Sequence, residues 1–240
     1  LGAFGRAADE LGKTSEAIEA LERSARITGF DKATVEVTGR LGTIYLRLGQ
    51  PDQALRWLRL AQGPLVLLER ELDRAHALVH LANLLAVRGD TAAAIHTLAN
   101  ALPERALGHY SHGMTIVAFA LAVLYDRDEQ RASAFEVLDH MQATLSTQYY
   151  VQVQREILRM PFAPPEDRHY FRALLYESQG HYAEARAEFA HYAASGQTPW
   201  QGRAFDHMAA IDAQRRAKPG PKQPQVIAPP RGIPRRLPRP

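Results

Sequence analysis

A small residue recurs five times along this chain, each time four positions before a large apolar residue. The spacings are 37, 40, 40 and 51 residues, and the small residues are Ala17, Ala54, Ala94, Ala134 and Ala185. The large residues that follow them are Leu21, Leu58, Leu98, Leu138 and Phe189. Residues four apart lie on one face of an α-helix, one turn from each other. The pattern therefore predicts one buried helix in each of five similar units.

Each of these helices is preceded by a predicted turn and by another helix. Five positions before the small residue, where a turn between helices often needs a positive φ, stand Gly12, Gly49, Gly89, Glu129 and Gly180. Twelve positions before it, small side chains that allow close helix packing occur at Gly5, Gly42, Ala82, Ala122 and Ala173. Because one helical hairpin cannot bury its apolar face alone, the units must stack. We therefore expect an all-α solenoid over residues 1–217.

The second and third units share an ordered motif. In the second unit the motif residues are Leu41, Gly42, Tyr45, Gly49, Ala54, Leu58 and Ala61. In the third unit they are Leu81, Ala82, Leu85, Gly89, Ala94, Leu98 and Ala101. This motif resembles the tetratricopeptide repeat (TPR), and the long spacing resembles the long-repeat bacterial type. The resemblance implies a right-handed α-solenoid of about five TPR-like units. Two positions depart from it, because Glu129 replaces the turn glycine and Arg172 stands where leucine is expected.

The long interval before the fifth unit leaves room for one extra helix. The sequence from Thr147 to Met160 is predicted to be helical, and Pro164 and Pro165 end it. Such a helix either packs against its neighbours or adds to a binding face, and both alternatives stay open. After the fifth unit, residues 198–217 are predicted to form a capping helix, with an apolar stripe of Trp200, Phe205, Met208 and Ile211.

The tail, residues 218–240, differs in composition from the rest of the chain. It holds eight of the 15 prolines and six basic residues, with no acidic residue. Without these six, 23 basic residues stand against 26 acidic ones, so the basic character belongs to the tail. Because proline disfavours helices and sheet interiors, we expect a disordered or extended segment. It is either a solvated linker or a docking segment for an acidic surface, with contacts from Lys218, Lys222, Arg231, Arg235, Arg236 and Arg239.

Residue types typical of catalytic and metal sites are absent or scattered. The chain has no cysteine, which excludes disulfides and zinc–thiolate sites. His76 with His80, and His109 with His112, have spacings compatible with a metal, but neither pair has an evident third ligand. The alternative is that all four are surface or groove histidines. No carboxylate pair is marked for acid–base chemistry, so we expect a non-enzymatic protein with no metal or cofactor.

In the tetratricopeptide family, the first helix of each unit lines a concave groove that binds a peptide or helix. The resemblance places Asn83 where the family often holds the backbone of its ligand. The groove positions that it implies are Arg6, Thr43, Arg47, His76, Val79, Asn83, Val87, Phe119, Val123, Arg127, Tyr170, Leu174 and Glu177. Some of them, such as Val123 and Leu174, are alternatively packing residues between helices.

These features predict a scaffold or adaptor of a bacterial multiprotein assembly, with the groove and the tail as two docking sites. One alternative is a sensory or regulatory module of a larger signalling protein. Another is association with nucleic acid through the tail, although no aromatic residue lies among its basic residues. We expect a protein partner and no small-molecule substrate. No apolar run approaches the roughly 18 residues that span a bilayer, and we favour the cytoplasm over the periplasm.

Overall fold

The computed structural model describes residues 1–29, 34–62, 71–102, 110–144, 166–196 and 199–217. Within these ranges all regular structure is helical. The helices are α1 (Gly2–Glu10), α2 (Thr14–Thr28), α3 (Val35–Arg47), α4 (Pro51–Leu60), α5 (Glu71–Val87), α6 (Thr91–Ala99), α7 (His112–Arg127), α8 (Arg131–Thr144), α10 (Asp167–Ser178), α11 (Tyr182–Ala194) and α12 (Gln201–Ala217).

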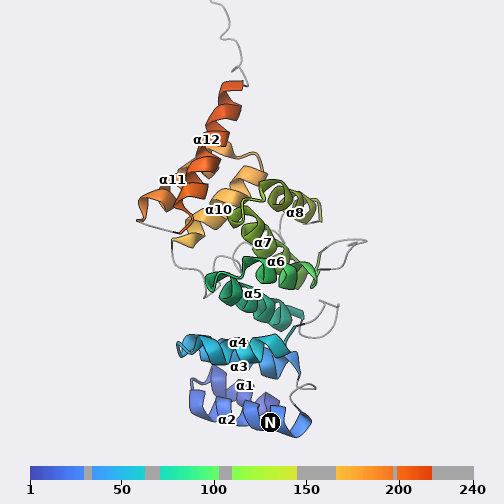
Figure 1. The fold of residues 1–240 in the computed structure, drawn as a ribbon. Coiled ribbons are helices and arrows are strands. Elements are labelled where there is room, and N and C mark those ends of the chain that lie inside the picture. The colour runs from blue at the N-terminus through green and yellow to red at the C-terminus, as the bar shows by residue number, and fades with distance from the viewer. Residues whose placement is uncertain (30–33, 63–70, 103–109, 145–165, 197–198, 218–240) are drawn as a thin grey trace, which may run out of the picture.

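Consecutive helices form hairpins, and the hairpins stack into an elongated array (Figure 1). The pairs are α1 with α2, α3 with α4, α5 with α6, α7 with α8, and α10 with α11. The first helix of a hairpin packs against the hairpin before it, as α5 does against α3 and α4. Helix α12 packs against α11 at the opposite end from α1. The all-α solenoid expected from the repeated columns is confirmed for the described part of the chain.

The two columns that define the repeat lie at the centre of each hairpin. The five alanines and the five large residues that follow them are all 0% exposed. Gly42 shows why the column in the first helix is small, because a Cβ built on it would lie 2.4 Å from Cγ of Leu58. The two helices of this hairpin thus approach closely enough to enclose Leu58 completely.

The turns inside the hairpins share one hydrogen-bonded geometry. In the second unit Gly49 has a φ of 68°, and its N–H donates to the carbonyl of Leu46 at 3.0 Å. The N–H of Gln50 donates to the carbonyl of Tyr45 at 2.9 Å. This pair of bonds is the Schellman motif, which ends a helix at a left-handed residue. Glu129 adopts the same conformation, with a φ of 61° and the same bonding pattern. The turn predicted at this column is confirmed.

Helix α12 confirms the predicted terminal helix but buries a different face. Ala204, His207 and Ile211 are buried, whereas Phe205 is 52% exposed. The predicted apolar stripe was therefore wrong at Phe205. The buried residues lie three or four apart on one side of the helix, and Phe205 is rotated about 100° from Ala204. A histidine, rather than an aromatic hydrocarbon ring, takes the central buried position.

Two predictions concern residues outside the described ranges. One is the extra helix from Thr147 to Met160, and the other is the extended conformation of the tail. Both stay predictions, as does the boundary between solenoid and tail.

Candidate partner-binding groove

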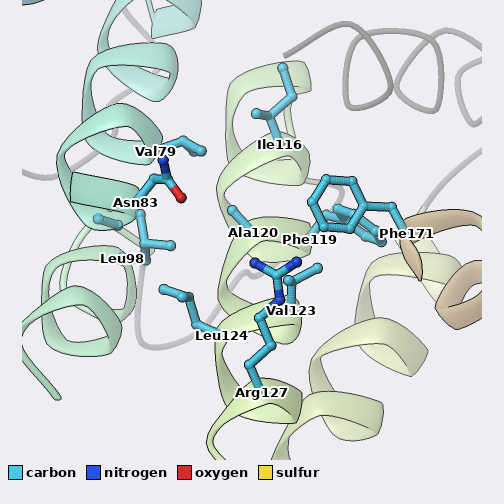
Figure 2. A pocket seen from close by; sticks show the side chains of 11 residues that line it. Val79, Asn83, Leu98, Ile116, Phe119, Ala120, Val123, Leu124, Arg127 and Phe171 are labelled. Atoms are coloured by element: carbon cyan, nitrogen blue, oxygen red, sulfur yellow. The ribbon is translucent and has the colours of Figure 1, made fainter. Parts of the chain in front are cut away.

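Helices α5 and α7 enclose a pocket that contains five of the predicted groove residues: Val79, Asn83, Phe119, Val123 and Arg127. The pocket has a volume of about 40 Å³, and Phe171 of α10 closes one side (Figure 2). The other lining residues are Ala82, Leu98, Ile116, Ala120 and Leu124. The structure thus brings together groove positions from the third and fourth units.

A larger cavity of about 400 Å³ adjoins this pocket and shares Asn83, Leu124 and Arg127 with it. Cavities of roughly 300–1,000 Å³ are typical of sites that enclose a ligand. The remaining lining residues are Ala86, Val87, Thr91, Asp167, Pro199 and Trp200. Because Pro199 and Trp200 directly precede α12, the placement of that helix determines one wall of the cavity.

Aromatic and aliphatic side chains make up most of the lining of the smaller pocket. Phe119 and Phe171 meet edge to face, with ring centroids 5.9 Å apart and ring planes at 88°. Both rings belong to the buried core that surrounds them, so the floor is already formed. Val87 lies in the wall of the larger cavity and is 78% exposed. An apolar side chain that packs against these residues loses contact with water, which favours its binding.

Asn83 and Arg127 supply the polar groups shared by both cavities. Figure 2 shows their side chains extending into the space between α5 and α7. Arg127 donates to Asp167 at 3.0 Å, and its guanidinium lies 5.0 Å from the ring centroid of Trp200. These contacts hold Arg127 in place. No described residue hydrogen-bonds the half-buried amide of Asn83, so this amide is available to a peptide backbone.

The predicted groove residues of the first two units lie outside both cavities. Arg6 and Arg47 form ion pairs with acidic residues of the same two hairpins, and the hydroxyl of Thr43 donates to a carbonyl of its own helix. His76 on α5 is half-buried and lines neither cavity.

The predicted groove residues of the last unit are enclosed by the protein itself. Tyr170 and Leu174 are 0% exposed, and Glu177 is 3% exposed. None of the three lines either cavity, and the groove role that the resemblance implied for them stays a prediction. Their side chains instead belong to the core and to a polar network beneath α12.

His207 of α12 is the centre of this network. Its Nδ1 lies 2.6 Å from a carboxylate oxygen of Glu177, and its Nε2 lies 2.9 Å from one of Asp126. Ionised carboxylates only accept hydrogen bonds, so both ring nitrogens must carry protons and His207 is an imidazolium. Arg203 donates to the carboxylate and to the backbone carbonyl of Asp126, each at 2.9 Å. Arg131 pairs with Glu177 from the start of α8.

The pKa values follow from these contacts. Burial alone would lower the pKa of His207, but hydrogen bonds and charges from Asp126 and Glu177 outweigh it and raise this pKa. Burial opposes ionisation of Asp126 too, yet His207, Tyr170 and Arg203 lower its pKa. Burial and the charge of Asp126 raise the pKa of Tyr170. The charged groups satisfy one another inside the protein, which favours a structural role in fastening α12.

The two histidine pairs differ in how much of each the structure describes. His80 is 5% exposed, and burial, with a contribution from His76, lowers its pKa to about 4. The interpretation of His80 as a surface or groove histidine was therefore wrong. His112 begins α7, and His109 lies outside the described residues. Within the described ranges, no three His, Cys, Asp or Glu residues could hold a metal ion.

Some pocket residues were missed by the sequence analysis. Leu124 and Phe171 each directly follow a predicted groove residue, so a search one position further along the helix finds them. Trp200 was assigned to the capping helix, and nothing in its spacing relates it to Asn83. Its position depends on contacts of α12 with residues far away in the sequence.

The stacked hairpins with a lined groove define a helical repeat protein. A comparison with family models matches residues 35–59 to the tetratricopeptide repeat, which covers α3 and most of α4. We therefore identify a tetratricopeptide repeat at residues 35–59, and a repeat of this kind suggests a protein-interaction module. Searches of curated proteins and of solved structures gave no match. In the described part, no helix combines the length and apolar character needed to cross a membrane.

Proposed function

We propose that this protein is an adaptor that holds a segment of another protein in the groove between α5 and α7. One observation carries the proposal: the two adjoining cavities combine an apolar lining with the available amide of Asn83. Among the residues that the structure describes, the scattered carboxylates and histidines line neither cavity except for Asp167. The protein-interaction role typical of tetratricopeptide repeats supports the same conclusion.

The groove fits an amphipathic helix or an extended peptide with a large apolar side chain. That side chain would enter past Val87 and pack near Phe119 and Phe171. The amide of Asn83 would then bond to the peptide backbone, which fixes the orientation of the ligand. Arg127, already held by Asp167, forms the boundary between the two cavities.

Peptides selected from a displayed random library provide a direct test. Their affinity for the unchanged chain and for three variants is measured by fluorescence anisotropy. Val87→Glu places a charge on the apolar path and should weaken binding by about tenfold or more. Asn83→Ala should weaken it about fivefold, the usual effect of one lost hydrogen bond.

Asn100→Ala is the matched control, because Asn100 is an exposed amide at the end of the outer helix α6. This variant should bind like the unchanged chain. Equal affinities for the control and both groove variants would reject the groove as the binding site. Circular dichroism of each variant verifies that the helices are intact.

The tail extends the same proposal to a multiprotein assembly. Its six basic residues suit a second contact with an acidic surface, and such a contact weakens as salt increases. The test compares partners crosslinked to the full chain with partners crosslinked to a chain ending at Ala217. A partner retained by the full chain alone, and released by salt, supports tail docking. Identical partners at every salt concentration make the tail a linker.

A further inference from the structure

Two residues that directly precede α12 complete the larger cavity of the groove. Pro199 and Trp200 line this cavity, and the ring centroid of Trp200 lies 5.0 Å from the guanidinium carbon of Arg127. The carbonyl of Trp200 accepts a hydrogen bond from the N–H of Ala204 at 3.1 Å. Trp200 is therefore joined to the first turn of α12, so the position of that helix sets the position of the ring.

The residue of α7 that precedes Arg127 holds the same helix. Asp126 accepts hydrogen bonds from Arg203 through its carboxylate and its backbone carbonyl, each at 2.9 Å, and its carboxylate lies 2.9 Å from Nε2 of His207. Only seven residues, about two helical turns, separate Trp200 from His207. A shift of α12 away from Asp126 therefore also moves Trp200 away from Arg127.

His207 is surrounded by the helices that α12 packs against. Asp126 of α7 and Glu177 of α10 face its two ring nitrogens, and Phe189 of α11 stacks on the ring with centroids 4.6 Å apart. The other charged or titratable groups of this cluster are Arg131 of α8, Tyr170 of α10 and Arg203 of α12. Both hydrogen bonds of the ring are thus made to carboxylates, and only the doubly protonated ring can donate both.

Loss of one proton from His207 turns one of these contacts into a repulsion. The deprotonated nitrogen presents a lone pair to a carboxylate oxygen at 2.6 or 2.9 Å, and the side chains of His207, Asp126 and Glu177 are at most 2% exposed. Because water cannot replace the missing hydrogen bond in so enclosed a site, the docked position of α12 becomes less favourable. Burial alone would lower the pKa of His207, but Asp126 and Glu177 raise it, so the proton is lost only as pH rises above the usual histidine range.

We propose that His207 is a positioning residue of the groove. Its imidazolium holds α12 on Asp126 and Glu177 and thereby keeps Trp200 in the wall of the larger cavity. When the ring loses a proton, α12 loosens, this wall opens, and the affinity for a peptide segment falls. The effect on affinity rests on the proposed function, whereas the position of Trp200 does not depend on any ligand.

The first test follows Trp200 without a ligand. Trp57→Phe leaves Trp200 as the only tryptophan of the 240-residue chain. Acrylamide quenching of its fluorescence is measured against pH, and the ring protons of His207 are titrated by NMR in the same chain. Quenching should increase as His207 loses its proton, because the ring of Trp200 then leaves the core and Arg127. Quenching that does not change across this titration overturns the proposal.

Two substitutions in the same background change the hydrogen bonds that His207 makes. In His207→Gln the amide donates from one end only, as a neutral imidazole does, so Trp200 should be strongly quenched at every pH. In Glu177→Gln the amide nitrogen can donate to an unprotonated Nδ1, and the amide carbonyl can accept from Arg131. The neutral ring of His207 then keeps both hydrogen bonds, and Trp200 should stay protected as pH rises. His191→Gln, which replaces an exposed histidine of α11, is the matched control and should keep the pH profile of the parent chain.

The two substitutions have opposite expected effects at high pH, so a general loss of stability does not produce both. Far-ultraviolet circular dichroism shows whether each variant retains its helices. If His207→Gln does not fold, Glu177→Gln alone decides, and a pH profile like that of the parent chain overturns the proposal.

The second test measures affinity across the same pH range. Its probe is a fluorescein-labelled peptide, selected on the unchanged chain in mildly acidic solution, whose binding Val87→Glu weakens. The dissociation constant should increase about fivefold or more as His207 loses its proton, the lower end of couplings between separate sites, and should change less in Glu177→Gln. A constant affinity despite exposure of Trp200 overturns the link to the groove and leaves the proposed function intact. If Val87→Glu weakens no selected peptide, the proposed function fails, and the quenching measurement still decides whether His207 positions Trp200.

Discussion

Two regions of the molecule are held together by different interactions. One is the stack, the helices from α3 to α7, and the other is the junction, where His207 of α12 packs over Asp126 and Glu177. In the stack, the central residues are apolar and fully buried, as at Leu41, Leu58 and Leu81. In the junction, buried ions hold the helices together, and His207 lies between Asp126 and Glu177. Apolar groups need only matching volume, whereas each buried ion needs a partner at the right distance. We therefore expect the stack to tolerate local change better than the junction does.

The two regions differ at one column of the repeat. The position three residues before the turn holds Asp9, Leu46, Ala86, Asp126 and Glu177 in the five units. In the middle units this position is apolar. In the first unit Asp9 is 7% exposed and pairs with Arg40 and Arg47. The residue at this position thus belongs to an ion network in the first, fourth and fifth units, and it is apolar in the second and third units.

The largest expected effect comes from breaking the junction at Asp126. Asp126→Ala leaves His207, Arg203 and the hydroxyl of Tyr170 without their shared acceptor. Removing one member of a buried ion network typically costs about 3–5 kcal/mol of unfolding free energy. Urea titration monitored by circular dichroism measures the loss.

Asp128→Ala is the control for this change, because Asp128 is exposed and its side chain accepts a hydrogen bond only from Gln130 among the described residues. It should change the unfolding free energy by less than about 0.5 kcal/mol. Similar losses for the two variants would mean that the network contributes little to the stability of the junction.

The pH dependence of stability should have opposite signs in the two regions. The folded pKa of His207 is above its unfolded value, so the stability that it contributes is complete below pH about 6.5 and decreases as pH rises through the folded pKa. The folded pKa of Asp126 is below its unfolded value, so its contribution decreases only when pH falls below the usual carboxylate range. The junction should be tightest in mildly acidic solution.

In the stack, His80 is buried in its neutral form, and its pKa is lowered to about 4. Its contribution is complete above pH about 6.5 and decreases as pH falls toward 4, by as much as about 3 kcal/mol. Hydrogen exchange measured by mass spectrometry, corrected for the intrinsic effect of pH, follows α12 and α5 separately. Acid should loosen α5 while α12 stays protected, and a pH above the folded pKa of His207 should do the reverse. If the protection of α5 and α12 changes in the same direction with pH, the two regions do not differ in their pH dependence.

A smaller effect distinguishes close packing in the stack from open space in the junction. Gly42→Ala puts a methyl group 2.4 Å from Cγ of Leu58, so the two helices must shift. Overpacking of this kind typically costs about 1–3 kcal/mol. Gly202→Ala makes the same change in α12, where nothing lies within 4 Å of the new Cβ.

Because alanine is a better helix former than glycine, Gly202→Ala should stabilise the protein by up to about 1 kcal/mol. Thermal unfolding of the two variants gives the comparison. If both stabilise the protein, the close contact between the helices of the second hairpin is not required.

The contrast between these regions explains what the sequence could predict. The columns at Ala54, Leu58 and Gly49 predict hairpins because their spacing follows helix geometry, which is local. The pocket residues Asn83 and Phe119 followed from the family resemblance, since they lie on repeat positions. The buried hydrogen bonds of Tyr170 and Glu177 did not follow, because their partners lie far away in the sequence.

No local pattern relates His207 to Asp126, which stands 81 residues earlier. Their pairing becomes visible only when the last helix is placed on the array. The acidic residues before the turns of the first, fourth and fifth units were nevertheless a readable signal, because the middle units have apolar residues there. That signal marks where buried ions replace apolar packing.

The smallest expected effect lies at the turns, where the two regions differ by one residue type. Glu129 has a φ of 61° in the turn that follows Asp126, whereas Gly49 has a φ of 68° in the stack. A left-handed conformation costs a residue with a side chain about 1–2 kcal/mol, and glycine avoids this cost but loses more entropy on folding. Glu129→Gly should therefore stabilise the protein by about 0.5–1 kcal/mol, and Gly49→Ala should destabilise it by about 1 kcal/mol. Urea titration of both variants measures the two changes in unfolding free energy. If Glu129→Gly instead destabilises the protein, the carboxylate of Glu129 contributes to the junction, and the ion network reaches as far as the turn.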